Sequence, residues 1–348
     1  MIGGDSAHAP IVWMRSATSN RARPGARSVG SVPSMARAYR PRRSCLAVPG
    51  SSRRFIDKAR GLPCDEVFLD LEDSVAPGAK AAARGTVIDA LSSGDWGGKL
   101  RAVRVNDART PWAYRDVIEV VEGAAANLDA IVLPKVIGPA DVSWLDLLLT
   151  QLESALGQPA GRIGIEAQIE DASGLAAVDA IAAASPRLEA LVFGPADFMA
   201  SLGMRSLEVG AQPAGYQGDA FHYPLLRILI AARSRGLMAI DGPYARIADL
   251  AGLERSAVGA AALGYDGKWV VHPGQIDTVN EAFTPAADEY DRAELILEAY
   301  EYYTGTEQRG AATLDGEMID EATRKLALAT AAKGRAADLT RTRRFRPG

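Results

Sequence analysis

One unit recurs along the sequence: a short apolar run ends in a polar residue and is followed by a segment with helical spacing. Eight such runs occur, most of them beginning about 30 residues apart. They lie at residues 44–48, 66–73, 99–106, 129–135, 162–170, 188–197, 236–243 and 267–273. Short β-branched runs that alternate with helices predict parallel strands, and eight such units predict a (β/α)8 TIM barrel of the α/β class. A doubly wound open sheet is the alternative, but it rarely has eight strands so evenly spaced.

Polar residues follow seven of the eight runs, at the point where each predicted strand ends. They are Glu72 and Asp73, Arg104 and Asn106, Lys135, Glu170, Asp197, Asp241, and His272. A barrel gathers the carboxyl ends of its strands at one face, and that face carries the active site. Helix capping alone hardly explains so many polar strand ends, so the pattern predicts an enzyme.

Two of these residues, Glu170 and Asp197, end runs that are separated by one helical segment over 173–184. The two strands should therefore be parallel neighbours and bring both carboxylates to the same edge. Hard oxygen ligands at such an edge suit Mg²⁺. The alternative is that each acid caps the following helix, which is common for Asp and poor for Glu. Glu166 points to the same side as Glu170 and competes for the role, but Glu170 lies at the end of the strand.

The chain divides into three predicted parts. Residues 1–41 are rich in Arg, Ser and Ala with a single acid, which predicts a disordered tail, although an organelle transit peptide has the same composition. Residues 42–284 form the predicted catalytic barrel. Residues 285–340 form a C-terminal helical extension, in which a Gly/Thr-rich linker over 304–316 separates two helices. The extension could act as a lid or as an arm that reaches another subunit. The alternative is that it is simply a packed terminal helix.

Composition excludes several classes of protein. The 348 residues carry a net charge of −4, which argues against nucleic acid as the main partner. No apolar run approaches the length of a membrane span. Cys45 and Cys64 make neither a disulfide framework nor a zinc site and fit a reducing compartment. We therefore expect a cytoplasmic protein, or a mitochondrial one only if residues 1–41 are a transit peptide.

A set of motifs occurs in a characteristic order over about residues 43–333. They are Val48-Pro-Gly-Ser-Ser-Arg53, Leu69-Asp-Leu-Glu-Asp-Ser-Val75, Arg104-Val-Asn106, Leu133-Pro-Lys135, Ile169-Glu170, Phe193-Gly-Pro-Ala-Asp197, Gly267-Lys-Trp-Val-Val-His-Pro273 and Met318-Ile-Asp320. In these motifs the chain resembles the citrate lyase β-subunit-like group of the HpcH/HpaI aldolase family. Within that group it is most similar to the malyl-CoA, β-methylmalyl-CoA and citramalyl-CoA lyases.

The resemblance implies a carbon–carbon lyase that uses Mg²⁺, or Mn²⁺ in its place. Its substrate would be a 3-hydroxyacyl-CoA, cleaved by reversible Claisen chemistry to acetyl-CoA or propionyl-CoA and glyoxylate or pyruvate. Glu170 and Asp197 would bind the metal directly, while Glu72 and Asp73 would hold metal-bound waters. Arg104 would hold the oxygen of the acyl-CoA that becomes negative, or alternatively form a salt bridge with Glu72 or Asp73.

The same resemblance implies the remaining contacts. The backbone at Gly194, Pro195 and Ala196 would meet the 2-oxo acid carboxylate. The loop with Pro49, Gly50, Ser51 and Arg53 would bind CoA, and Lys80 and Lys135 could pair with CoA phosphates. Asp320 would come from a neighbouring subunit of a homo-oligomer, a trimer or hexamer, and complete the site.

The residue types fit this chemistry on their own terms. Splitting a carbon–carbon bond beside a thioester leaves an enolate, which needs a fixed cation such as Arg104. A carboxylate such as Asp320 can move a proton to or from the enolate carbon. Two alternative activities stay open, a (3S)-malyl-CoA thioesterase and a citrate lyase β-subunit that acts on carrier-bound substrate. A barrel without activity is a further alternative, and the particular 3-hydroxyacyl-CoA is not determined.

Overall fold

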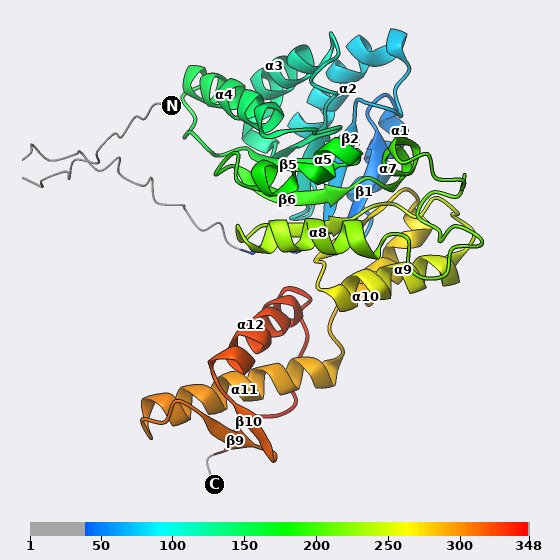
Figure 1. Cartoon of the computed structure of the whole chain (residues 1–348). Helices are drawn as coiled ribbons and strands as arrows, with labels where there is room; N and C mark the ends of the chain where they lie inside the picture. The colour runs from blue at the N-terminus through cyan, green and yellow to red at the C-terminus, as the bar shows by residue number, and fades with distance from the viewer. Residues whose placement is uncertain (1–38, 347–348) are drawn as a thin grey trace, which may run out of the picture. The chain divides into compact units, whose positions relative to one another are not determined.

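A closed barrel of eight parallel strands forms the centre of the protein (Figure 1). The computed structural model describes residues 39–346, so the predicted tail lies outside the described residues up to position 38. The strands are β1 Ser44–Pro49, β2 Glu66–Asp70, β3 Leu100–Arg104, β4 Ala130–Leu133, β5 Gly164–Ile169, β6 Leu188–Phe193, β7 Met238–Asp241 and β8 Gly267–Val270. Each strand pairs with its neighbour in the sequence, and β8 closes the barrel against β1. The predicted barrel is confirmed.

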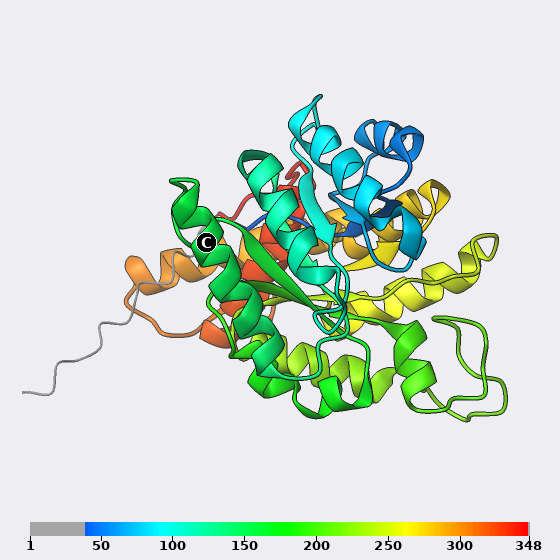
Figure 2. The ribbon, with the colours of Figure 1, turned by 90° about the horizontal axis from the view of Figure 1, so that it is seen from above.

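Helices surround the strands, as the view from above shows (Figure 2). They are α1 Arg53–Arg60, α2 Lys80–Ser92, α3 Ala113–Ala124, α4 Pro139–Ala155, α5 Ala172–Ala176, α6 Val178–Ala182, α7 Pro195–Ser201, α8 His222–Arg233, α9 Leu250–Leu263 and α10 Ile276–Phe283. The helix predicted over 173–184 is instead two short helices that meet at Ala177. Several ends carry the expected caps: Ser52 and Asp249 accept hydrogen bonds at the start of α1 and α9, and Gly264 ends α9 with φ 112°.

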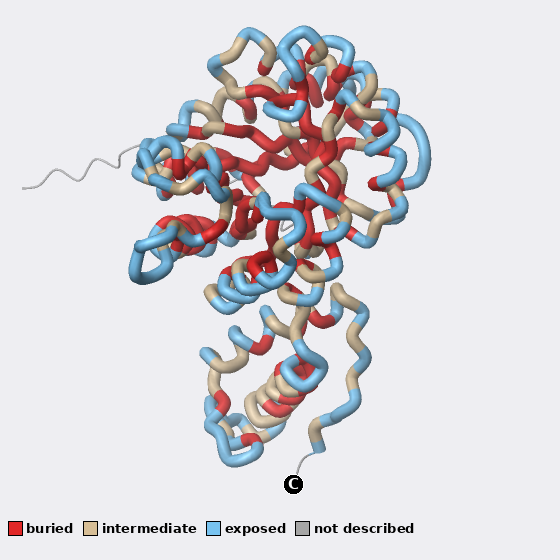
Figure 3. The backbone as a smooth tube through the Cα atoms, turned by 90° about the vertical axis from the view of Figure 1, so that its right-hand side faces the viewer, coloured by how far each residue is buried: buried red, intermediate tan, exposed pale blue. Residues whose placement is uncertain are grey.

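Apolar side chains fill both sides of the strands, so the barrel has no open channel. The core between strands and helices is built mainly from Val, Leu, Ile and Ala. Figure 3 shows the buried stretches of the backbone in red. A second apolar layer lies inside the barrel, where the rings of Phe68 and Trp269 pack at a tilt of 35° with centroids 4.2 Å apart. This layer supports the polar groups at the carboxyl ends of the strands. Among the described residues, no helix is long and apolar enough to span a membrane.

The C-terminal extension contains a hairpin that the sequence analysis missed. Its elements are α11 Ala287–Gly305, β9 Ala312–Leu314, β10 Glu317–Ile319 and α12 Glu321–Ala336. The residues predicted as a linker include β9, which pairs antiparallel with β10. Asp315 and Gly316 join them with φ 52° and 85°, the conformation of a two-residue hairpin turn. That residues 285–340 act as a domain separate from the barrel stays a prediction.

Candidate active site

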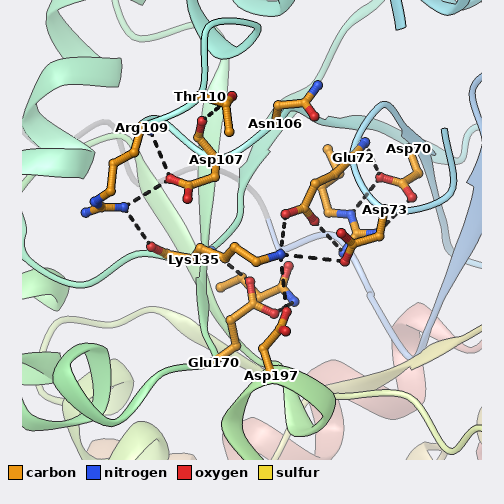
Figure 4. A network of polar contacts seen from close by, with 12 residues as sticks. Asp70, Glu72, Asp73, Asn106, Asp107, Arg109, Thr110, Lys135, Glu170 and Asp197 are labelled. Atoms are coloured by element: carbon orange, nitrogen blue, oxygen red, sulfur yellow. Dashed lines mark hydrogen bonds and ion pairs between the residues drawn. The ribbon is translucent and has the colours of Figure 1, made fainter. Parts of the chain in front are cut away.

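Five charged side chains that follow strands β2, β4, β5 and β6 come together at the carboxyl end of the barrel, and we call them the carboxyl-end cluster (Figure 4). Glu72 and Asp73 follow β2, Lys135 follows β4, Glu170 follows β5, and Asp197 lies in the first turn of α7 after β6. The sequence predicted a strand that continues to Asp73, but β2 ends at Asp70. Glu72 and Asp73 therefore project from a turn. The cluster is therefore assembled by the barrel topology, as expected.

The Lys135 ammonium lies at the centre of this cluster. Its nitrogen is 2.5 Å from Glu72 Oε1, 3.2 Å from Asp197 Oδ2 and 3.6 Å from Asp73 Oδ2. Glu72 is buried, whereas the side chains of Asp197 and Asp73 are 44% and 64% exposed. A positive group among three carboxylates that are open to solvent on one side marks the position where the protein favours a cation.

Glu170 is held in place by two hydrogen bonds. The backbone N–H of Lys135 donates to its Oε1 at 2.7 Å, and the Gln168 amide donates to its Oε2 at 2.5 Å. Gly194 allows this position, because a Cβ there would lie 2.6 Å from Glu170 Oε2. Burial, followed by the charge of Glu72, raises the pKa of Glu170 to about 8. A carboxyl group that is costly to ionise in the absence of a metal is a group that a divalent cation would stabilise.

Arg104 at the end of β3 is fixed by two acids. It makes a bidentate pair with Asp70 at 2.7 and 2.8 Å, and its third nitrogen lies 3.1 Å from Glu72 Oε2. The guanidinium also lies over the Trp269 ring, 5.5 Å from its centroid. Burial tends to raise the pKa of Asp70, but Arg104 outweighs it and holds that pKa below its ordinary value. The salt bridge to Glu72 that the sequence suggested is present, and Asp70 is the stronger partner.

The donor set fits Mg²⁺ in chemistry, since Glu170 and Asp197 offer hard carboxylate oxygens beyond the ends of the adjacent strands β5 and β6. Within residues 39–346, no three Asp, Glu, His or Cys side chains are grouped closely enough to enclose an ion. Two carboxylates with open positions match a catalytic Mg²⁺, which usually keeps several waters and is bound through one or two carboxylates. Glu72 and Asp73 lie where they could accept hydrogen bonds from such waters.

A cavity of about 350 Å³ adjoins the cluster and is lined by Glu72, Asp73, Asn106, Trp112 and Lys135, among others. Its size suits part of a small ligand. Lys80 also lines it, but its ammonium is directed at the protein, donating to the carbonyl oxygens of Leu71 and Glu72 at 2.9 and 2.8 Å. Lys80 therefore holds the turn that carries Glu72, a role that the sequence did not suggest.

The loop after β1 was predicted to bind CoA and lies at the same end of the barrel. Gly50 donates to the Asp70 carbonyl at 2.8 Å, and a Cβ at Gly50 would approach that oxygen to 2.8 Å. Pro49 ends β1, Ser51 is exposed, and Arg53 is half-exposed and pairs with Asp57 on α1. The loop thus presents polar groups to solvent beside the site.

Asp320 lies in the C-terminal extension and caps α12. Its carboxylate accepts hydrogen bonds from the backbone N–H and the hydroxyl of Thr323 at 2.9 and 3.0 Å. These contacts are with its own helix, so within the described single chain Asp320 serves as a helix cap. Its arrival at a neighbouring subunit's site stays a prediction.

The structure separates the two competing glutamates. Glu166 lies deep in the barrel in what we call the amino-end cluster, formed by Arg42, Glu66, Glu166 and Glu189. Arg42 Nε is 2.9 Å from an oxygen of Glu66 and 2.9 Å from one of Glu166, and both glutamates are fully buried. Glu170 alone faces the carboxyl-end cluster. This placement supports the choice of Glu170 over Glu166.

Two residues of the site were not singled out from the sequence, Asp70 and Gln168. Asp70 pairs directly with Arg104 across β2 and β3, a register that no local pattern reveals. Gln168 lies in β5 two positions before Glu170, which follows the strand, so the two side chains point to the same side and are hydrogen-bonded. The two-residue spacing could therefore have identified Gln168 from the sequence.

Comparison with known proteins gives consistent matches. A family model described as HpcH/HpaI aldolase/citrate lyase matches residues 43–273. An L-malyl-CoA/beta-methylmalyl-CoA lyase from Cereibacter sphaeroides is 40% identical over 83% of this chain and 93% of its own length. A (3S)-malyl-CoA thioesterase from the same species is 34% identical over 82% of this chain and 92% of its own. The structure of the protein CitE from Mycobacterium tuberculosis, in complex with magnesium, acetoacetate and coenzyme A, is 30% identical and matches with a TM-score of 0.65, covering 84% of this chain and 97% of that one.

Proposed function

The chain belongs to the HpcH/HpaI aldolase/citrate lyase family, and we propose that it is a Mg²⁺-dependent acyl-CoA lyase. It cleaves a 3-hydroxyacyl-CoA (malyl-CoA, β-methylmalyl-CoA or citramalyl-CoA) to acetyl-CoA or propionyl-CoA and glyoxylate or pyruvate. The observation that carries this proposal is the convergence of Arg104 and Lys135 with the carboxylates of Asp70, Glu72 and Asp197 at the carboxyl end of the barrel. Relatives named as lyases of malyl-CoA and beta-methylmalyl-CoA support it.

The metal is proposed to bind Glu170 and Asp197, with Glu72 and Asp73 accepting hydrogen bonds from its waters. When bound there, Mg²⁺ supplies Lewis-acid stabilisation to the substrate hydroxyl that becomes the 2-oxo acid carbonyl. The protein orients the Glu170 carboxylate in advance, because the Lys135 backbone N–H and the Gln168 amide each donate a hydrogen bond to one of its oxygens. The solved relative in complex with magnesium supports the choice of this metal.

Arg104 stabilises the charge that the reaction creates. In cleavage the substrate hydroxyl gives its proton to a base in the site and its oxygen becomes the carbonyl oxygen of the 2-oxo acid. The adjacent carbon–carbon bond breaks, and its electron pair moves onto the thioester as an enolate. A guanidinium fixed by Asp70 and Glu72 meets that oxygen without reorganising. Asp320 of a neighbouring subunit is proposed to move the proton to or from the enolate carbon, which requires a homo-oligomer such as a trimer or hexamer.

The remaining predicted contacts complete the substrate site. The backbone from Gly194 to Ala196, at the start of α7, is proposed to bind the 2-oxo acid carboxylate. The loop from Pro49 to Arg53, together with Lys80 and Lys135, is proposed to bind CoA, although Lys80 would first have to leave its two carbonyl partners. A cytoplasmic location is proposed on the two cysteines, Cys45 and Cys64, which are both buried and unpaired.

A second candidate function is hydrolysis of the malyl-CoA thioester, favoured by the relative named (3S)-malyl-CoA thioesterase. The same metal site and Arg104 would serve both reactions. The deciding experiment incubates purified protein, with Mg²⁺ or with EDTA, with malyl-CoA and citramalyl-CoA and follows 2-oxo acid and free thiol separately. Mg²⁺-dependent oxo acid without thiol is the expected result. Thiol and malate without oxo acid would establish the thioesterase instead.

A further inference from the structure

Lys135 has a backbone conformation that lysine rarely adopts. Its φ is 52°, in the left-handed region, and the other described non-glycine residues with positive φ are Gln308, Asp315 and Asp338, all outside the barrel. In this conformation its N–H donates to Glu170 Oε1 at 2.7 Å, while its carbonyl accepts from Arg109 at 3.2 Å. A strained residue at a cluster of charges suggests that its placement serves the site.

The side chain of Lys135 serves the same site from the other direction. Its ammonium contacts Asp197 at 3.2 Å and Glu72 at 2.5 Å. The side chain is 30% exposed, so it has room to move into solvent or into the adjoining cavity. Its four-carbon stem is flexible, and the backbone N–H could stay on Glu170 while the ammonium moves.

We propose that the Lys135 ammonium is an exchangeable counter-ion of the metal site. It neutralises Glu72 and Asp197 while the site is free of metal, and it leaves Asp197 when Mg²⁺ binds. This inference rests on the proposed function, because it takes Glu170 and Asp197 as the Mg²⁺ ligands. The physical reason is that an ammonium and Mg²⁺ on the same carboxylate repel each other at short range. Mg²⁺ must therefore displace the lysine from Asp197 to bind.

Two consequences distinguish this role from binding of CoA phosphates. Removal of the ammonium takes away a competitor, so Mg²⁺ should bind more tightly even when no CoA compound is present. The metal-free protein should also become less stable, since carboxylates that Lys135 neutralised are left to repel each other. A lysine that only bound CoA would alter neither property.

The test titrates Mg²⁺ into wild-type protein and Lys135→Met by calorimetry without substrate and records melting temperatures in EDTA. Lys135→Met keeps the length of the stem and removes the charge. We expect it to bind Mg²⁺ about tenfold more tightly than wild type and to melt at a lower temperature in EDTA. Lys135→Arg, which keeps the charge, should bind Mg²⁺ nearly as wild type does.

Lys58→Met is the matched control, because Lys58 is an exposed lysine on α1 and the substitution changes the total charge equally. It should leave the Mg²⁺ affinity unchanged. Lys135→Gln is measured alongside, so that the result does not depend on the folding of one variant. Unchanged or weaker Mg²⁺ binding by the uncharged Lys135 variants would overturn the inference. Absence of Mg²⁺ binding by the wild type would instead overturn the proposed function, and this inference with it.

Discussion

The two ends of the barrel hold charged clusters of similar composition but opposite accessibility. In the amino-end cluster, the side chains of Arg42, Glu66 and Glu166 are at most 4% exposed. In the carboxyl-end cluster, the side chains of Asp197 and Asp73 are 44% and 64% exposed. A closed ion cluster keeps its cation, whereas an open one can exchange it. Accessibility therefore separates a cluster that supports the fold from one that can do chemistry.

The electrostatics of the two clusters differ in the same way. Burial, together with the neighbouring charge of Glu166, raises the pKa of Glu66 well above its ordinary value. Arg42 contacts both Glu66 and Glu166, so one buried cation serves two buried carboxyl groups, which fits Glu66 keeping its proton. In the carboxyl-end cluster the corresponding neutralising role is taken by Lys135, a residue that can move. The comparison predicts that changes at one end alter catalysis and changes at the other alter stability.

The largest effect is expected for Asp197→Ala at the open end. Loss of a metal ligand should lower Mg²⁺-dependent turnover by about 1,000-fold or more. The fold should persist, because the Asp197 side chain is 44% exposed. Oxo acid release and circular dichroism of the same preparation check both parts. Full activity of this variant in EDTA would contradict a role for a metal ion in catalysis.

Arg42→Met tests the closed end. It leaves Glu66, Glu166 and Glu189 without their shared cation, and a broken buried ion cluster typically costs about 3–5 kcal/mol of unfolding free energy. Denaturant unfolding measures this loss, while kcat of the protein that remains folded should match wild type. A variant that is as stable as wild type but inactive would reverse the roles assigned to the two ends.

Arg104→Lys keeps a cation at the open end but loses the planar guanidinium. We expect kcat to fall about 100-fold, because the group that meets the developing enolate is no longer held by both Asp70 and Glu72. Mg²⁺ affinity, measured by calorimetry, should hardly change. A large drop in metal affinity with normal kcat at saturating Mg²⁺ would assign Arg104 to the metal site instead.

Glu170 should make Mg²⁺ binding depend on pH. Its pKa is raised to about 8, so the metal must displace a proton at neutral pH. Mg²⁺ affinity should rise about tenfold per pH unit between about pH 6 and 7 and level off above about 8. Because the folded pKa exceeds the ordinary value of 4.5, this group also favours the metal-free fold at low pH, and that contribution is lost as pH rises through about 8. A flat affinity profile in this range would contradict the raised pKa.

The smallest effect is expected for Glu66→Gln at the closed end. Burial raises the pKa of Glu66, so the fold favours its neutral form, and a neutral amide of the same shape should change the unfolding free energy by less than about 1 kcal/mol. Because the pKa of Glu66 is higher in the fold than in the unfolded chain, ionisation of Glu66 lowers the unfolding free energy as pH rises. The Glu66→Gln variant should lack this decrease in stability. A loss of several kcal/mol at pH 7 would indicate instead that Glu66 is ionised and paired with Arg42.

Sequence reasoning reached the barrel because its eight units are regular, and it reached Glu170 and Asp197 because both follow closely on the end of a strand. It could not pair Asp70 with Arg104, since that contact depends on the register of β2 against β3. It also could not place the ammonium of Lys135, because lysine gives no local signal for a φ of 52°. The hairpin around Asp315 and Gly316 is different, since Asp-Gly is a known turn signal and was available in the sequence.

The position of the bound cation tests the central claim most directly. Crystals grown with Mn²⁺ in place of Mg²⁺ would locate the metal by anomalous diffraction. The account predicts one strong peak between Glu170 and Asp197, with the Lys135 ammonium withdrawn from Asp197. A peak elsewhere, or no peak from a protein whose turnover requires the metal, would contradict it.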